Sequence, residues 1–395
     1  MSAERAPVAI YQAVSVILRW MLTHGRSQAN SGGGAAGYAN AGIFQLCRHV
    51  LLSAGRSLGT RLLGLSCVFL LLGSVNTCPT DAVAAFDLRS EYHRPTEIPF
   101  PEDNQYSAAK AALGQKLFFD KRLSGEDSLA CASCHRPELA WGDGLARAVG
   151  WSGSVLPLRS PTLLNVAWTS ILGWDGKFGD LESVAFAPLL APGNMHQTES
   201  ELVAKLGAVP AYLDAFGRVF GTPKITRRAI ELALATFQRT IVSGEAPFDR
   251  WVEGDEMAIS AEAKRGFDLF NGRANCNACH AGWNFTEGAF YDIGLPGDGV
   301  GRGRAFPNSV KLHGAFKAPT LRDVARRAPY MHDGSLPDLD AVIEFYDGGG
   351  QKRPSRSDLI RPLGLTQAQK SELRAFLATL SEDRGSPATL QLKQP

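Results

Sequence analysis

Two short cysteine motifs are the residues of this chain with the clearest chemistry. Residues 131–135 read CASCH, and residues 276–280 read CNACH. A zinc site or a redox disulfide needs the cysteines but not a histidine directly after them, whereas covalent haem attachment uses all three side chains, two as thioethers and one as the proximal iron ligand. A zinc site built from both pairs would leave the two histidines unexplained. We therefore predict two covalently bound haem c groups, held by Cys131, Cys134, Cys276 and Cys279, with His135 and His280 as iron ligands.

The first 85 residues have the composition of a leader. Arg56 and Arg61 precede the apolar stretch LLGLSCVFLLLG, which has the length of a signal-peptide core, and DAVAAF offers small residues for cleavage after Ala84. Residues 1–50 include the glycine-rich run NSGGGAAGYANAG, which predicts a disordered extension or a start codon placed too early. The alternative is that the apolar stretch stays uncleaved as a membrane anchor.

Charge and cysteine usage point to the same compartment. The leader holds six arginines, no lysine and two acidic residues, so its removal changes the formal net charge from +2 to −2. A nearly neutral chain gives no reason to expect a nucleic acid as partner. Three of the seven cysteines, Cys47, Cys67 and Cys78, lie in the leader, and the other four are all in the two haem motifs. Export followed by haem attachment predicts a bacterial periplasmic protein.

The pattern of apolar residues after the leader is helical. Ile230, Leu234, Phe237 and Ile241 recur at helical spacing, and a similar stripe follows Ser260, a candidate helix cap. A third stripe at 373–380 follows a candidate capping box made by Thr366 and Gln369. All three predict amphipathic helices that pack on a core.

Long loops separate these helices, and signals for strands are weak. DIGLPGDGVGRGR and YDGGGQKRPSRSD are rich in glycine and charge. Short helices with long loops are expected where a cofactor supplies much of the core. We predict a mainly α fold of two cytochrome c-like domains with one haem each, residues 86–250 and 251–395. The composition, 45% hydrophobic and 20% charged, does not separate an enzyme from a carrier.

From about residue 110 to 381 the chain resembles the bacterial di-haem cytochrome c peroxidase family, which includes the MauG-type enzymes. The matching stretches, in the family's order, are LGQKLFFDKRLSGEDSLACASCH, RSPTLLNVAW, GWDGKFGDLE, FNGRANCNACH, FKAPTLRDVARRAPYMHDGSL and LTQAQKSELRAFLATL. The resemblance implies an N-terminal haem where peroxide reacts and a C-terminal haem that stores or relays the second oxidising equivalent.

The resemblance leaves three functions to weigh. We predict a periplasmic MauG-type oxidoreductase, in which hydrogen peroxide forms a high-valent di-haem state that oxidises a protein substrate. The alternative is a cytochrome c peroxidase, which reduces peroxide with electrons from a small cytochrome c or copper protein. The third is a non-enzymatic di-haem electron carrier. The sequence identifies neither the protein partner nor the oligomeric state, and membrane contact is expected only if the leader is uncleaved.

For the first haem, the residues on the far side of the iron decide peroxide access. No histidine lies between His135 and His196, and the loop that carries a blocking histidine in many family members reads ARAVGWSGS here, which predicts an open coordination position. The family places a catalytic glutamate six residues after a proline, but here Pro188 is followed at that spacing by Asn194. An amide can position peroxide but cannot exchange a proton, so His196 or Glu199 is the candidate substitute. A surface role for His196 is the plainer interpretation.

For the second haem, the residues alone offer Met331 and Tyr346 as ligands opposite His280. Methionine opposite histidine is the common cytochrome c arrangement and on general grounds favours Met331. The resemblance reverses this preference, because Tyr346 stands at the family's ligand position and MauG-type enzymes have a tyrosine there. A phenolate is a hard donor that stabilises higher oxidation states of iron. The alternative is an ordinary buried tyrosine.

Two further residues take their meaning from the resemblance. Trp174 in GWDGK matches the tryptophan between the two haems, where an indole can relay charge; without the motif it would be a core aromatic. Arg159 stands where the family has an asparagine that helps to hold calcium between the haems. Its guanidinium can take the charge role of the ion, so calcium is not our expectation, although backbone carbonyls near Arg327 and Pro329 are available to bind it.

Overall fold

The computed structural model describes residues 87–382, which all fall in the second of the two units into which the chain divides. The predicted signal segment, its cleavage point and the predicted extension lie outside the described residues. Within residues 87–382 no helix is long and apolar enough to cross a membrane.

Helices make up most of the regular structure, as predicted, and the sheet content is small. The helices are α3 (Ala108–Phe118), α4 (Cys131–Cys134), α5 (Leu181–Leu190), α6 (Glu199–Gly207), α7 (Pro210–Phe220), α8 (Arg227–Arg239), α9 (Pro247–Val252), α10 (Ala261–Asn271), α11 (Leu339–Gly348) and α12 (Gln367–Ala378). Strands β1 (Phe290–Tyr291) and β2 (Phe316–Lys317) pair antiparallel, with Phe290 opposite Lys317.

Short 3₁₀ helices occupy many of the loops. They are Leu88–Tyr92, Glu102–Asn104, Lys121–Leu123, Pro137–Leu139, Trp151–Gly153, Val166–Trp168, Cys276–Ala278, Arg302–Arg304, Val310–Leu312 and Val324–Arg326. The predicted loops DIGLPGDGVGRGR and YDGGGQKRPSRSD are thus irregular apart from one such turn and the end of α11.

The predicted helix signals coincide with observed helices. Ser260 caps α10 by accepting a hydrogen bond from the Ala263 amide, and Thr366 and Gln369 form the predicted capping box of α12. The stripe that begins at Ile230 lies in α8. Ile241 is buried as the stripe requires but lies beyond the end of α8, where its backbone amide bonds to the Gln238 carbonyl.

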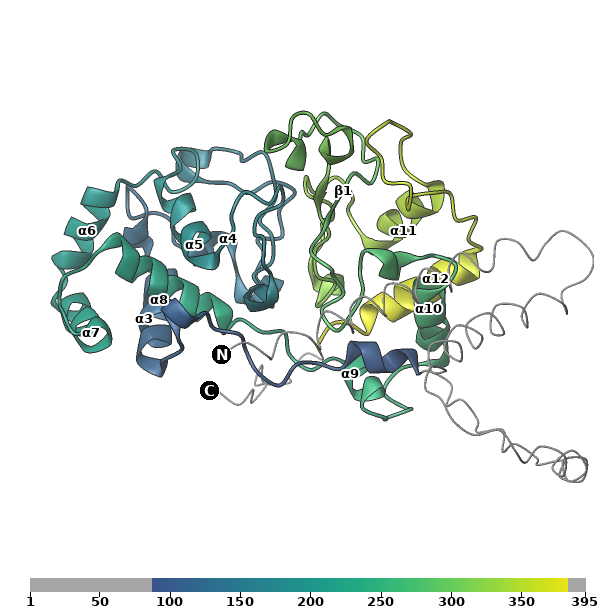
Figure 1. Cartoon of the computed structure of the whole chain (residues 1–395), viewed down its shortest axis with the longest axis horizontal. Helices are drawn as coiled ribbons and strands as arrows, with labels where there is room; N and C mark the ends of the chain where they lie inside the picture. The colour runs from purple at the N-terminus through teal and green to yellow at the C-terminus, as the bar shows by residue number, and fades with distance from the viewer. Residues whose placement is uncertain (1–86, 383–395) are drawn as a thin grey trace, which may run out of the picture. The chain divides into compact units, whose positions relative to one another are not determined.

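Two large hydrophobic cores and a smaller cluster of Val166, Leu172, Leu181 and Ala235 lie under the helices of the described chain. The first is built from residues between Leu113 and Ile241, and the second mainly from residues between Phe248 and Leu380. Figure 1 shows the helices of the first core, α3 to α8, grouped apart from α9 to α12. Tyr92, from the start of the described chain, packs into the second core against Phe248 and Phe285.

A glycine brings the two main helices of each core close together. A Cβ on Gly114 of α3 would lie 1.9 Å from the Ala233 carbonyl oxygen of α8. In the second core, a Cβ on Gly266 of α10 would lie 2.0 Å from the Glu372 carbonyl oxygen of α12. No side chain fits at either contact, because atoms in protein interiors are already close-packed. Each core therefore carries the same kind of close helix crossing beside its cysteine motif.

Candidate functional site

Both cysteine motifs line one cavity of about 900 Å³. The four cysteines are free thiols, and burial raises the pKa of Cys131 and of Cys276 to about 12. Zinc sites and redox pairs need thiolates, which such burial disfavours. Among residues 87–382 no three histidine, cysteine or acidic side chains are grouped to hold a metal ion. The cavity walls are largely apolar, which suits a macrocycle attached through the cysteines better than a clustered metal ion.

The two motif histidines are held in the same way. His135 Nδ1 lies 3.1 Å from the Trp141 carbonyl oxygen, and His280 Nδ1 lies 2.8 Å from the Phe285 carbonyl oxygen. Burial lowers the pKa of both rings, so each is neutral and donates its Nδ1 proton to the carbonyl. The Nε2 lone pair is then free for a metal, and the donated hydrogen bond fixes the ring, as is usual for histidine ligands. These residues fit a proximal haem ligand in each half.

The loop around Val149 brings the candidate peroxide residues to the first motif. The Cys134 sulfur lies 3.9 Å from the Val149 carbonyl oxygen, and the Trp151 amide donates to the Asn194 carbonyl at 2.6 Å. Gly150 permits this contact, because a Cβ there would lie 2.1 Å from the Gly193 carbonyl oxygen. The other loop residues that line the cavity here, Ala148, Leu156, Pro157 and Leu158, have no side chain that binds iron.

Pro188 and Asn194 both line the cavity. Pro188 lies inside α5, and its carbonyl accepts the Met195 amide, which turns the chain back after the helix. The Asn194 side-chain amide has no hydrogen-bond partner within the described chain, so it is available to a bound molecule.

His196 has a different position from Asn194. Its residue has a left-handed backbone, with φ at 49°, and its exposed ring stacks on Trp151 at 4.1 Å between centroids. Neither His196 nor Glu199 lines the cavity; Glu199 begins α6 and pairs with Arg227 at 3.6 Å. The geometry thus favours Asn194 over these two as the residue that meets a molecule in the cavity.

Both candidate ligands of the second haem line the shared cavity. Tyr346 lies in α11 and Met331 in a turn with φ at 70°, and both line the cavity. Burial raises the pKa of the Tyr346 hydroxyl, with further contributions from Cys279 and Cys276, which places this phenol beside the second motif. No residue in the described range accepts or donates a hydrogen bond at the Tyr346 hydroxyl. A half-buried phenol that lines the cavity without a hydrogen-bond partner is available to a bound group.

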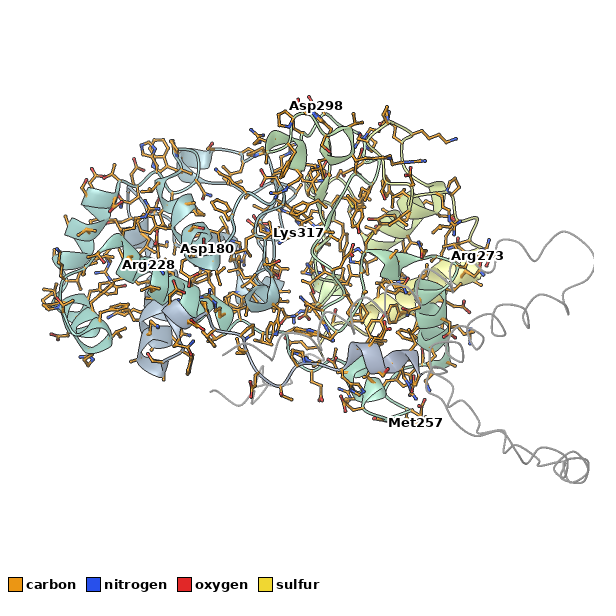
Figure 2. All side chains as sticks on the ribbon, viewed as in Figure 1. Asp180, Arg228, Met257, Arg273, Asp298 and Lys317 are labelled. Atoms are coloured by element: carbon orange, nitrogen blue, oxygen red, sulfur yellow. The ribbon has the colours of Figure 1, made fainter. Side chains whose placement is uncertain are left out.

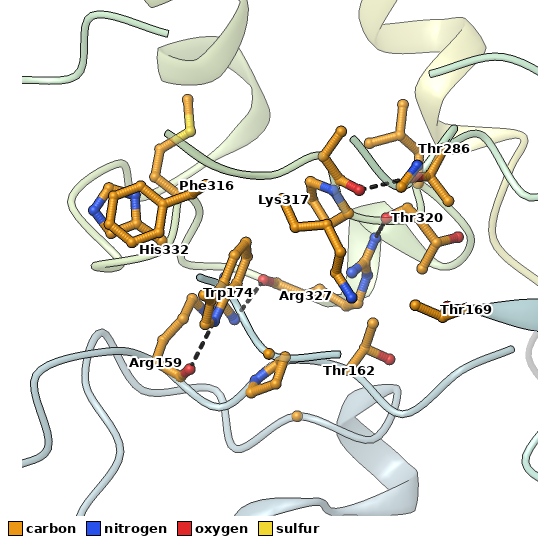
Figure 3. A pocket seen from close by; sticks show the side chains of 18 of the residues that line it. Arg159, Thr162, Thr169, Trp174, Thr286, Phe316, Lys317, Thr320, Arg327 and His332 are labelled. Carbon is orange, nitrogen blue, oxygen red and sulfur yellow. Dashed lines mark hydrogen bonds between the residues drawn. The ribbon is translucent and has the colours of Figure 1, made fainter. Parts of the chain in front are cut away.

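Trp174 joins the two halves of the unit. Its indole Nε1 donates to the Arg159 carbonyl oxygen at 3.0 Å, and its own carbonyl accepts the Lys317 amide at 2.9 Å. Arg302 holds the same loop by donating to the Asp175 and Gly176 carbonyl oxygens. Figure 3 shows Trp174 in the cavity wall, next to Arg159.

Arg159 occupies the place predicted for a calcium ligand. It is 8% exposed, and its Nη2 donates to the Arg327 carbonyl oxygen at 3.0 Å, as Figure 3 shows. That carbonyl is one of the oxygens that sequence analysis left open for calcium. The Arg159 backbone amide also bonds to the His332 carbonyl at 3.0 Å.

Sequence reasoning missed two side chains of this wall, those of Lys317 and Arg327. Both line the cavity, and both lie in the stretch FKAPTLRDVARRAPYMHDGSL, where only Met331 and backbone carbonyls near Arg327 and Pro329 were considered as ligands. The sequence feature that could have identified Lys317 is its position between Phe316 and Ala318, because a lone cation among apolar residues needs a partner.

Comparisons with known proteins agree with this site. A sequence model of the di-haem cytochrome c peroxidase family matches residues 108–257. The methylamine utilization protein MauG of Methylorubrum extorquens is 47% identical, over 81% of this chain and 93% of its own length. The cytochrome-c peroxidase IdrP1 of Denitromonas iodatirespirans is 38% identical, over 79% of this chain and 92% of its own.

A solved structure gives the same result for the fold. The crystal structure of a MauG-like protein associated with microbial copper homeostasis matches with a TM-score of 0.69 and 31% identity, over 74% of this chain and 94% of that chain. Membership of a family of enzymes sets aside the alternative of a non-enzymatic carrier. The chain belongs to the di-haem cytochrome c peroxidase family that includes the MauG proteins, and it is a haem peroxidase-type oxidoreductase.

Proposed function

We propose that the chain is a periplasmic enzyme of the MauG type, which reacts with hydrogen peroxide and withdraws electrons from a protein substrate. It would carry one covalently bound haem in each half, with the halves dividing near residue 250. The observation that carries the proposal is Tyr346, a half-buried phenol that lines the cavity beside Cys276 and Cys279 without a hydrogen-bond partner in the described chain. When bound, the two haems supply the electron-transfer chemistry that peroxide reduction requires.

The residues of the first half would admit and orient peroxide. Cys131 and Cys134 would attach the haem, and His135, oriented by the Trp141 carbonyl, would hold its iron. Ala148, Leu156 and Leu158 would give the cavity an apolar lining without iron-binding side chains. Asn194 then offers a hydrogen-bond donor and acceptor to the peroxide but no titrating group. Proton transfer between the two oxygens would pass through water, which makes this step slower than with a carboxylate.

The residues of the second half would hold an iron closed by two protein ligands. His280 and Tyr346 would hold the iron of the second haem, and the hard oxygen donor of Tyr346 would favour oxidised states and lower the reduction potential relative to a thioether. Trp174 is hydrogen-bonded to both halves and would carry charge between them. An enzyme with this arrangement would suit the oxidation of a protein partner by electron transfer over a distance.

Met331 supports the second candidate, a cytochrome c peroxidase that takes electrons from a small cytochrome c or copper protein. It lines the same cavity and would give the thioether ligand that is common in electron-transfer haems. The relatives at 38% identity that are named cytochrome-c peroxidase favour the same candidate.

A stopped-flow experiment separates the two candidates. The oxidised protein is mixed with one equivalent of hydrogen peroxide and then with a reduced small cytochrome c. The MauG-type proposal predicts that both haem absorptions change without prior reduction and that the cytochrome is oxidised slowly. A protein that ignores peroxide until it is reduced, and then oxidises the cytochrome rapidly in steady state, would establish the second candidate instead.

Calcium is not part of this proposal. The Arg159 guanidinium already supplies positive charge at the Arg327 carbonyl oxygen, which would otherwise face the ion. Treatment with a calcium chelator is expected to leave the optical spectra of both haems unchanged. A spectral change that added calcium reverses would show that the ion is bound in addition to Arg159.

A further inference from the structure

Three cations in the wall of the shared cavity lack an acidic partner. Arg159, Lys317 and Arg327 all line it, and none forms an ion pair with a carboxylate of residues 87–382. Two buried arginines elsewhere in the described chain do have an acidic partner. Arg239 pairs with Glu182 at 2.6 Å, and Arg322 pairs with Asp249 at 2.7 Å. The cavity cations are therefore an exception that needs an explanation.

The contacts that these cations do make are few and neutral. Lys317 Nζ donates to the Ile171 carbonyl oxygen at 3.0 Å, Arg159 Nη2 to the Arg327 carbonyl, and Arg327 Nη2 to the Thr320 carbonyl. The Nε atoms of both arginines are buried and have no hydrogen-bond partner in the described chain. Donor capacity is thus left over on all three side chains.

The electrostatics of the cluster are unfavourable as they stand. Burial lowers the pKa of Lys317 to about 8, and burial together with the charge of Arg159 lowers the pKa of Arg327 to about 10. A positive charge that is partly removed from water without a counter-ion is unfavourable. An anion at this place would remove that cost and satisfy the free donors at once.

The cluster also lies at the junction of the two halves. Lys317 in β2 reaches Ile171 of the first half, and Arg159 of the first half reaches Arg327 of the second. Figure 2 shows Lys317 in the interior, between the two groups of helices, and Figure 3 shows all three cations in the wall of the cavity around Trp174. An anion bound here would touch both halves.

We propose that Arg159, Lys317 and Arg327 form a carboxylate-binding subsite that takes the propionate groups of the two haems. This inference rests on the proposed haem binding. The motif cysteines anchor the vinyl-derived edge of each ring, and the carboxylates are the anionic groups that a haem brings into an otherwise apolar cavity. The cofactors would then be bound at one edge by thioethers and at the other by cations, and their carboxylates would join the two halves.

The test compares Lys317→Gln with Lys177→Gln in the haem-loaded protein. Lys177 lines the same cavity, but it is exposed and its Nζ lies 5.4 Å from the centre of the Phe178 ring. Resonance Raman spectra report the bending modes of haem propionates, and spectroelectrochemical titration reports the reduction potentials. We expect Lys317→Gln to shift a propionate mode and to lower the potential of one haem, because a positive charge that disfavours the ferric form is lost. Lys177→Gln is expected to change neither.

One further variant and one crystal structure complete the test. Lys317→Arg keeps the charge and is expected to restore the potential, and a crystal structure of the haem-loaded wild type should place a propionate oxygen within salt-bridge distance of Lys317 Nζ. Propionate modes that are the same in Lys317→Gln and wild type, or a propionate that points away from all three cations, would overturn the subsite. Wild-type spectra that depend on added phosphate would overturn it too, because the anion would then be a free one. A purified protein that contains no haem would contradict the proposed function itself.

Discussion

The two cysteine motifs are alike on one side of the cavity and different on the other. In both halves the motif histidine is half-buried, and its Nδ1 faces a backbone carbonyl five or six residues later in the chain. The opposite walls differ: the first half presents Asn194 and apolar loop residues, and the second presents Tyr346 and Met331. The difference teaches that the surroundings of each motif histidine are set by a short local segment and repeat in both halves, whereas the facing walls come from distant segments and differ.

Removing one cysteine pair has the largest expected effect on this comparison. Cys276→Ala with Cys279→Ala should leave a chain with one covalent haem, because the two thioethers of the second half are lost. Cys131→Ala with Cys134→Ala is the matched variant for the first half. The haem that stays with the chain after denaturation, measured as the pyridine haemochrome, should fall by about half in each. Two covalent haems in either variant would contradict the assignment.

Replacing Tyr346 tests what makes the second half different. Tyr346→Phe removes the phenol oxygen without changing the shape of α11, so the optical and EPR signals of the second haem should change while those of the first stay the same. Tyr330→Phe is the control, because Tyr330 lines the same cavity but donates its hydroxyl proton to the Val324 carbonyl at 2.8 Å. If Met331→Leu changes the second haem and Tyr346→Phe does not, methionine is the ligand.

Adding an acid–base group to the first half tests what its cavity wall lacks. Asn194→Glu should speed peroxide activation on the order of 10²-fold, the lower end of general acid–base effects, because a carboxylate can move the proton between the two oxygens. Stopped-flow absorbance after addition of peroxide measures the rate. His196→Gln should leave the rate unchanged, since His196 is exposed and outside the cavity lining. A rate that falls in His196→Gln and does not rise in Asn194→Glu would assign the role to His196.

A smaller effect, on stability, is expected from a mutation in the first core that leaves the second core unchanged. Glu182 pairs with Arg239 at 2.6 Å in the first core, and both are buried. Glu182→Gln leaves the guanidinium without a charge partner and should lower the free energy of unfolding by about 3 kcal/mol, measured by chemical denaturation. The spectrum of the second haem should not change. Asp358→Asn, which breaks the exposed pair with Lys311, should cost at most about 1 kcal/mol.

The same pair makes a signed prediction about pH. Burial by itself would raise the pKa of Glu182, but hydrogen bonds from Arg239 and Asn104 outweigh it, and the pKa lies below its ordinary 4.5. The stability that Glu182 contributes is therefore complete above pH 4.5 and is lost as the pH falls through the depressed value. Glu182→Gln should flatten this acid limb of the unfolding curve. An unchanged slope below pH 4.5 would show that the pair does not contribute.

Much of the fold and the local arrangement of each cysteine motif could be predicted, because their signals are local, and haem attachment itself stays a prediction. Apolar spacing and caps such as Ser260 and Thr366 identify helices within a dozen residues, and each motif places its histidine beside its cysteines. Ile241 shows the limit: it keeps the apolar spacing but not the helix, because its carbonyl is used by the Asn165 amide of another segment.

The opposite wall could be predicted only in part. Tyr346 and Trp174 were found through a resemblance, since their spacing alone does not distinguish them from core aromatics. The separation of His196 from Asn194 depends on a left-handed turn that sends neighbouring side chains in different directions. Lys317 was missed because its meaning comes from the absence of a carboxylate around it, and only the packed structure shows what surrounds a buried charge.

An EPR spectrum of the oxidised, haem-loaded protein tests the difference between the two halves most directly. We predict one high-spin signal from the open first haem and one low-spin signal from a second haem closed by His280 and Tyr346, and both should disappear after one equivalent of hydrogen peroxide. Two low-spin signals that are indifferent to peroxide would contradict this account, because both irons would then be closed by protein ligands.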